Sequence, residues 1–161
     1  MITAYLTHPH CVLHHMGPEH PESPERLEAI RARLSLSGLL QQTMQGDAKE
    51  ADDEALARVH PLRHLKALEK CVPDEGIVTL DSDTMMNPES LKAARVAAGA
   101  VIRGVDQVYK RQADNVFCAV RPPGHHAEAA DAMGFCFYNN VAVGAAHARA
   151  KYGARRIAIL D

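Results

Sequence analysis

Short apolar runs alternate with longer segments in which apolar residues recur at helical spacing. Residues 2–7 and 115–120 are rich in β-forming and apolar side chains, so each run predicts a strand. Residues 88–111 carry apolar side chains every three or four positions, which predicts the longest helix of the chain. Asn87 precedes this helix as a candidate cap, with Pro88 at the first helical position. We expect the helix to be core scaffold without chemistry of its own.

Three shorter helices are predicted between the first strand and the long helix. Residues 24–37 follow Ser23, whose hydroxyl is a candidate N-cap. Residues 53–59 and 61–71 predict two further helices, and leucines fall in register along the second of them. Residues 41–45 give a weaker indication of a short strand.

The last third of the chain has the pattern of a strand, a helix and a strand joined by short loops. Residues 141–152 are rich in small residues and predict a helix that ends at Gly153. Residues 156–161 are apolar and rich in β-formers, which predicts a final strand. Together with the strand at 115–120 they form a βαβ pattern, which indicates a parallel sheet with a right-handed crossover. The pattern alone therefore predicts an α/β fold.

The composition is that of an ordinary globular domain. Of the 161 residues, 47% are hydrophobic, and the formal net charge is −2, so neither a nucleic-acid partner nor a membrane surface is indicated. No run approaches the about 18 apolar residues of a membrane span, and the N-terminus lacks the features of a signal peptide. The four cysteines form no CxxC pair, so we expect reduced thiols and a cytoplasmic location.

Five histidines lie between residues 8 and 20, which raises the question of a metal site. Their spacing matches no compact site, and no cysteine or carboxylate constellation accompanies them. We therefore assign no metal to this segment.

The adjacent histidines His125 and His126 are the strongest candidates for chemistry. They follow the strand at 115–120 on a rigid Arg-Pro-Pro-Gly loop, and ligands of α/β sheets bind at the carboxyl ends of strands. Histidine transfers protons near neutral pH, so the pair is a candidate acid/base site. A solvated turn that happens to carry two histidines is the alternative interpretation.

Several longer motifs around this pair resemble the zinc-dependent histone deacetylase family. Arg-Pro-Pro-Gly-His-His at 121–126 is followed by Gly-Phe-Cys-Phe-Tyr-Asn-Asn at 134–140. Further similar pieces are His-Pro-Glu-Ser-Pro-Glu-Arg-Leu at 20–27, Asp-Ser-Asp-Thr at 81–84 and Ile-Ala-Ile-Leu-Asp at 157–161. The chain is most similar to the class II-like branch, which includes bacterial deacetylase-like amidohydrolases and acetylpolyamine amidohydrolases.

The resemblance implies the fold and the chemistry. It sharpens the fold class to the arginase–deacetylase type, an open parallel sheet with helices on both faces. It also implies that residues 1–161 are the N-terminal portion of a catalytic domain. The implied activity is zinc-dependent hydrolysis of an acyl amide, with acetyl-lysine, an acetylpolyamine or a related acetylated amine as substrate.

The same resemblance implies roles for three residues in catalysis. His126 matches the general base that later acts as the acid, and His125 matches its electrostatic partner. Asp161 matches the carboxylate that orients His125 and that also binds a monovalent cation, usually potassium.

Four residues match the family's substrate channel and its surroundings. Gly134 matches a backbone group near the substrate, and Phe135 matches an aromatic wall that suits an alkyl stem. Arg26 matches an arginine of the internal cavity through which acetate leaves, and Asp83 matches an acidic residue that holds the substrate backbone. Taken without the resemblance, Phe135 is ordinary core, Arg26 a helix-surface cation and Asp83 part of a polar turn.

No residue of this chain is assigned to zinc. The family motif is Asp-x-Asp-x-His, of which Asp161 matches only the first aspartate. An open zinc site needs about three protein ligands, so we expect the chain alone to be inactive. We also expect the final strand at 156–161 to leave an exposed edge through which the chain self-associates.

Two interpretations from different classes remain open. The chain is either part of an amidohydrolase that is active only when whole, or a non-catalytic assembly or binding module on the same scaffold. The retained histidine pair favours the first, and the missing zinc ligands favour the second. The arginase-like branch is disfavoured, because its binuclear metal motifs do not fit the Pro-Pro-Gly-His-His loop.

Overall fold

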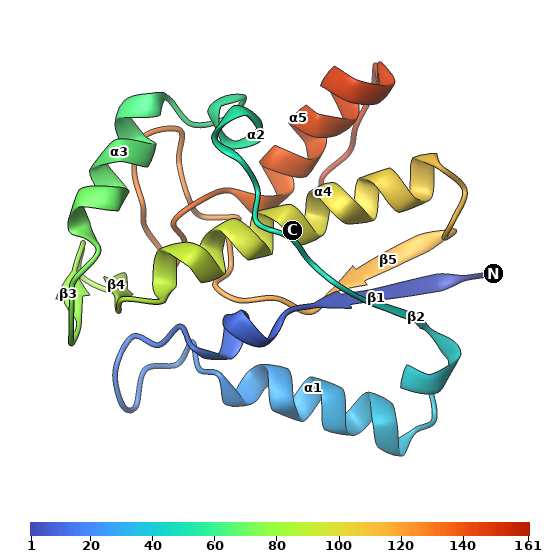
Figure 1. The fold of residues 1–161 in the computed structure, drawn as a ribbon, viewed down its shortest axis with the longest axis horizontal. Coiled ribbons are helices and arrows are strands. Elements are labelled where there is room, and N and C mark those ends of the chain that lie inside the picture. The colour runs from blue at the N-terminus through green and yellow to red at the C-terminus, as the bar shows by residue number, and fades with distance from the viewer.

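Three parallel strands form the centre of the fold, which a computed structural model describes for residues 1–161 (Figure 1). They are β1 (Thr3–Thr7), β2 (Met44–Asp47) and β5 (Asn115–Cys118), in the order β2-β1-β5. In register, β1 pairs Ala4 with Met44 of β2 and with Val116 of β5. The parallel sheet predicted from the βαβ pattern is therefore present, and β5 lies at one of its edges.

Five helices and several short elements complete the chain. The helices are α1 (Glu25–Leu36), α2 (Asp53–Ala57), α3 (Leu62–Cys71), α4 (Ser90–Tyr109) and α5 (Asn140–Tyr152). Short 3-10 turns lie at Pro9–Val12 and Leu40–Gln42, and β3 (Val78–Thr79) pairs antiparallel with β4 (Met85–Met86). No helix has the length and apolar character that crossing a membrane requires.

The helices cover both faces of the sheet, as the arginase–deacetylase type of fold requires. Figure 1 shows α4 and α5 on one side of the strands and α1 on the other. The α4 helix packs against β1, β5 and α5, and its alanines are almost completely buried. One apolar cluster joins β1, α1 and α4, and a second joins α3, α4 and the segment around Phe137. The second cluster supports the loop that carries the histidine pair.

Most predicted elements are confirmed, with changes at their ends. The α4 helix begins at Ser90, two residues later than expected, because Asn87 and Ser90 bond to each other in a turn. The side chain of Ser23 makes no cap bond to α1, although its carbonyl accepts from the Arg26 N–H. The weak strand expected at 41–45 is present as β2.

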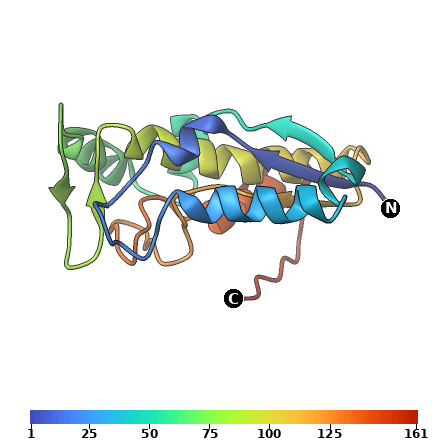
Figure 2. The same ribbon diagram turned by 90° about the horizontal axis from the view of Figure 1, so that it is seen from below.

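The strand predicted at residues 156–161 is not formed. The segment pairs with no strand, its apolar side chains are exposed, and Leu160 is 97% accessible. Figure 2 shows it running away from the body of the molecule. A β-rich sequence becomes a strand only where a neighbour pairs with it, and here the chain leaves α5 in another direction. The self-association expected through this strand stays a prediction, and β5 is the outer strand on its side of the sheet.

The segment after β2 crosses α4 at very short range, which is possible because residue 99 is glycine. A Cβ placed on Gly99 would lie 1.7 Å from the Lys49 carbonyl oxygen. The contact is between two backbones, so neither side can yield by turning a side chain. The Ala51 N–H also donates to the Arg95 carbonyl at 2.9 Å, which fixes the crossing.

We predict that Gly99→Ala destabilises the protein by about 2 kcal/mol, since overpacking against backbone costs that order of energy. Helix propensity alone would stabilise the same substitution by about 1 kcal/mol, so the sign separates the two effects. Urea denaturation measures the change. Gly46→Ala is the matched control, because its Cβ would meet only side chains, the flexible end of Arg103 and a methyl group of Leu6, and no backbone. A stabilised Gly99→Ala would contradict the close crossing.

Candidate functional site

The histidine pair lies on the loop that follows the carboxyl end of β5. The loop begins with a cis peptide between Arg121 and Pro122. His125 and His126 are both exposed, and their ring centroids are 4.1 Å apart. The two imidazoles therefore lie next to each other and in reach of solvent, as two groups that exchange protons with one bound molecule must.

Gly134 packs against His126 from the far end of the loop, and Phe135 follows it in the chain. A Cβ on Gly134 would lie 2.7 Å from the Cβ of His126, so no larger residue fits there. Both residues have positive φ angles, +56° at Gly134 and +68° at Phe135. A non-glycine residue at positive φ is uncommon and costs backbone energy, so surrounding contacts must hold it. One of them is the Phe135 N–H, which donates to the Thr84 hydroxyl at 3.0 Å.

Asp83 and His20 join Phe135 at the rim of the site. The edge of the His20 ring meets the Phe135 ring with a centroid distance of 4.8 Å. Nε2 of His20 lies 3.2 Å from the Asp83 carbonyl oxygen. Asp83 belongs to the polar turn that the sequence predicted, in which an Asp81 carboxylate oxygen accepts from two backbone N–H groups. The structure thus brings Asp83, Phe135 and Gly134 together, with His20 as an addition.

Arg26 reaches the start of the same loop from α1. Its Nη2 donates to the Val120 carbonyl at 2.8 Å, one residue before the Arg-Pro-Pro-Gly stretch. The Arg26 side chain is exposed. It lies near the predicted site, with its guanidinium bonded to the backbone of the chain.

Asp161 is the predicted site residue that the structure does not bring to the others. It ends the unpaired segment after α5 and is exposed. No hydrogen bond or ion pair joins it to His125 or to any other residue of the site. Its role as the carboxylate that orients His125 stays a prediction.

A buried ion pair that the sequence did not reveal ties the loop to the segment before α1. Arg121 is completely buried, and its guanidinium donates to both carboxylate oxygens of Glu22 at 2.6 and 2.5 Å. Its third nitrogen donates to the carbonyls of Cys11 and His14. A bidentate pair of this kind fixes both partners in position and orientation.

The charge state of Glu22 depends on the buried groups around its carboxylate. Burial by itself would raise the pKa of Glu22, but the His14 ring, whose Nε2 lies 3.5 Å from a Glu22 oxygen, and the hydrogen-bonded Arg121 guanidinium lower the pKa to about 2. Burial also lowers the pKa of His14. Glu22 and Arg121 both lie in motifs that the sequence analysis identified. Only the folded chain shows that these two residues, 99 positions apart, are partners.

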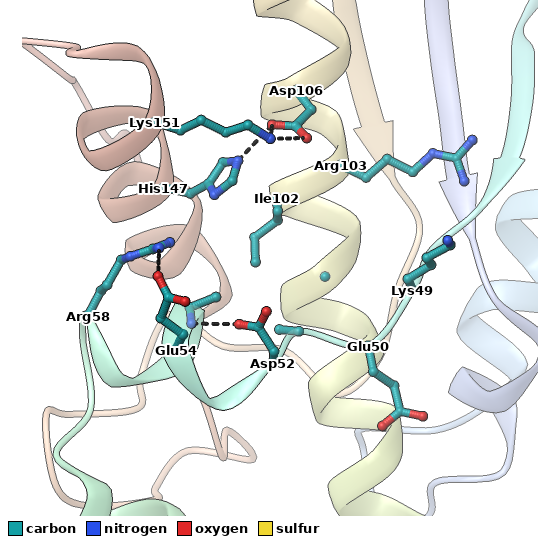
Figure 3. Close-up of a pocket in the computed structure, with 13 residues that line it drawn as sticks. Lys49, Glu50, Asp52, Glu54, Arg58, Ile102, Arg103, Asp106, His147 and Lys151 are labelled. Carbon is teal, nitrogen blue, oxygen red and sulfur yellow. Dashed lines mark hydrogen bonds and ion pairs between the residues drawn. The ribbon is translucent and has the colours of Figure 1, made fainter.

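The largest cavity lies away from this site. It has a volume of about 680 Å³ and is lined by α2, α4, α5 and the segment around Lys49 (Figure 3). Its carboxylate Asp106 accepts from His147 at 2.7 Å, Lys151 at 2.9 Å and Tyr152 at 2.9 Å. Burial by itself would raise the pKa of Asp106, but these hydrogen bonds lower it to about 2. The cluster joins α4 to α5, and its charges are largely paired with one another.

The residues of this chain do not make a metal site of the kind that zinc requires. No three side chains from histidine, cysteine, aspartate and glutamate lie close enough together to hold a metal ion. A catalytic zinc takes three protein ligands and one open position, and the pair at residues 125 and 126 has no carboxylate bonded to it. We therefore derive no chemical step through a metal from these residues.

Comparison with known proteins gives one consistent result. The family model of the histone deacetylase domain matches residues 20–161. A histone deacetylase-like amidohydrolase of Pseudomonas aeruginosa is 41% identical over 142 residues, which is 88% of this chain and 37% of that protein. The polyamine deacetylase HDAC10 of Homo sapiens is 39% identical over 145 residues, which is 87% of this chain and 22% of that protein.

A solved structure shows the same similarity in three dimensions. The crystal structure of the HDA15 HD domain superposes with a TM-score of 0.86 at 36% identity, covering 92% of this chain and 43% of that one. The chain thus spans less than half the length of each of these three similar proteins.

We predict that Glu22→Gln destabilises the protein by about 3 kcal/mol at pH 7, because it leaves the buried charge of Arg121 unpaired. The folded pKa of Glu22 is about 2 against an ordinary value of 4.5, so its contribution is complete above about pH 4.5. As the pH falls from there towards 2, Glu22 of the unfolded chain takes up a proton while the folded carboxylate stays charged, so the difference shrinks. Urea denaturation at pH 7 and pH 3 measures both values.

The exposed Glu19 provides the control for this experiment. Glu19→Gln removes one carboxylate without touching Arg121, and we expect a change within about 0.5 kcal/mol. A Glu22→Gln protein as stable as this control, or a difference unaffected by pH, would contradict the buried pair.

Proposed function

Because the chain belongs to the histone deacetylase domain family, we propose that it carries the proton-transfer residues of a site that hydrolyses an acylated amine. The observation that supports this most directly is the pair of exposed imidazoles 4.1 Å apart, held against Gly134 at the carboxyl end of a parallel strand. An abandoned site would not need that contact, which restricts residue 134 to glycine.

Hydrolysis of an amide needs two proton transfers. A base takes a proton from the attacking water, and an acid gives one to the departing amine, which is otherwise a poor leaving group. We assign both transfers to His126, the ring packed against Gly134. His125 is its electrostatic partner, adjacent and equally exposed.

The substrate class we propose is an amine acylated at the end of an alkyl stem. The similar proteins are named as a histone deacetylase-like amidohydrolase and as a polyamine deacetylase. Phe135 directly follows Gly134, which packs against His126, and an alkyl stem packs well on an aromatic ring. His20 and Asp83 at the rim offer polar groups for the part of the substrate outside.

Three further assignments belong to the proposal. Asp161 orients His125 and binds a monovalent cation such as potassium, which requires residues 155–161 to lie differently from the exposed path they take here. Arg26, bonded to the Val120 carbonyl, serves the carboxylate product. Zinc is held by residues outside these 161, because no ligand set is present among them. The chain alone is then inactive.

Joining the chain to the rest of a domain tests this function. We would fuse the part of the Pseudomonas aeruginosa protein that follows its matched region after Asp161, and measure hydrolysis of a fluorogenic acetyl-lysine amide. We expect His126→Ala to lower kcat/KM by about 100-fold or more, as loss of a general acid/base does. His15→Ala is the matched control, because His15 is an exposed histidine outside the site.

The outcomes separate the two classes of function. A folded, zinc-loaded fusion that turns over substrate, and loses this with His126→Ala only, supports the hydrolase. A folded fusion with zinc but no turnover would contradict the proposal and leave a non-catalytic binding or assembly module. Equal activity of the His126→Ala and His15→Ala proteins would contradict only the role of His126 and would leave the proposed hydrolase activity standing.

A further inference from the structure

His60 is a completely buried histidine whose two ring nitrogens both bond to the loop that carries the histidine pair. It lies between α2 and α3, immediately before Pro61. Its Nδ1 is 3.0 Å from the Ala129 carbonyl oxygen, and its Nε2 accepts from the backbone N–H of Asn139 at 2.9 Å. The site described above does not include it.

These two bonds determine the tautomer of His60. A backbone N–H can only donate, so Nε2 must be without a proton. A carbonyl oxygen can only accept, so the proton must be on Nδ1. His60 is therefore the neutral imidazole with hydrogen on Nδ1, and a second proton on Nε2 would face the Asn139 N–H directly.

Asn139, which bonds to His60 through its backbone, also bonds through its side chain to the backbone next to the histidine pair. The side-chain nitrogen of Asn139 donates to the Ala127 carbonyl at 3.0 Å and to the His125 carbonyl at 3.4 Å. Its side-chain oxygen accepts from the Ala142 N–H at 3.0 Å and so caps α5. Asn139 thus links His60, the backbone of the pair and the first turn of a helix.

We infer that His60 is a positioning residue for His125 and His126, acting through Asn139. In its Nδ1-protonated tautomer it holds both ends of the segment from Ala129 to Asn139, and through that segment sets the backbone on which the pair stands. This inference rests on the proposed function for its catalytic meaning, while the bonds themselves are testable without any activity.

The groups around His60 favour its neutral form. The centroid of the His60 ring lies 5.0 Å from that of His64 in α3 and 5.6 Å from that of Tyr138. The backbone of Glu128 also faces the His60 ring. No carboxylate forms an ion pair with His60. Burial, the largest effect, and the neighbouring His64 lower the pKa of His60 against the bond to Ala129.

Two substitutions separate the two bonds of His60. The amide oxygen of glutamine can take the place of Nε2, so His60→Gln keeps an acceptor for the Asn139 N–H. The shorter asparagine can place its amide nitrogen near Nδ1, so His60→Asn keeps a donor for Ala129 and leaves the Asn139 N–H unpaired. His64→Gln is the matched control, because it removes a neighbouring buried imidazole but keeps a donor for the Phe137 carbonyl.

NMR on the 161-residue chain is the first measurement. Long-range correlation of ring protons with ring nitrogens should show His60 neutral and protonated on Nδ1 at pH 7. Amide exchange of Asn139 should accelerate about tenfold or more in His60→Asn and stay within about threefold of wild type in His60→Gln and His64→Gln. The backbone resonances of His125 and Ala127 should move with the Asn139 amide.

A proton on Nε2, or a charged His60 at pH 7, would overturn the inference on the wild-type protein even if a variant fails to fold. Equal Asn139 exchange in His60→Asn and His60→Gln would also overturn it. In the active fusion we expect His60→Asn to lower kcat about tenfold with KM unchanged, and His60→Gln to restore most of it. An inactive wild-type fusion would count against the proposed function, whereas an active one in which His60→Asn has no effect would count against His60 alone.

Discussion

The buried ion pair between Arg121 and Glu22 is the interaction on which the arrangement of the site depends. Arg121 precedes the histidine pair by four residues, and Glu22 follows His20 by two. With both side chains almost inaccessible and bonded through two oxygens, the loop after β5 and the segment before α1 have one relative position. Breaking such a pair costs far more than an exposed one, because the remaining charge stays buried.

The site is assembled from segments that are distant in the sequence and joined by polar contacts. His20 reaches the Asp83 carbonyl, the Thr84 hydroxyl accepts from the Phe135 N–H, and the Asn139 N–H donates to His60 at the α2–α3 junction. Apolar packing determines how closely the helices lie on the sheet, but because it is not directional it does not determine the conformation of a loop. Satisfied buried hydrogen bonds do, since every misplaced donor or acceptor carries a desolvation cost.

The sequence predicted the elements that depend on local pattern. The strand at 115–120, the helix that Gly153 ends, and the loop that carries His125 and His126 all follow from periodicity and turn residues, and the structure contains them. The strand at 156–161 failed, because its pattern describes a preference that only a neighbouring strand can satisfy.

The hydrogen bonds and the ion pair that connect the segments of the site could not be predicted from local sequence pattern. Glu22 and Arg121 lie in two separate motifs, neither of which indicates a partner, and residue 60 falls between the helices predicted at 53–59 and 61–71. Their partners are 99 and about 70–80 positions away, and nothing in a local pattern encodes a contact at that separation. Family resemblance located the histidine pair and the rim, but not the residues that hold them in place.

We propose that this chain supplies proton-transfer and substrate-binding residues, and its side chains form no set of metal ligands in the structure. The most direct test is the zinc content of the purified 161-residue chain after equilibration with zinc and removal of the excess, measured together with hydrolysis of an acetyl-lysine amide. We predict clearly less than one bound zinc per chain and no turnover. One tightly bound zinc per chain together with turnover would contradict it, because the ligands would then have to come from residues that the structure keeps apart.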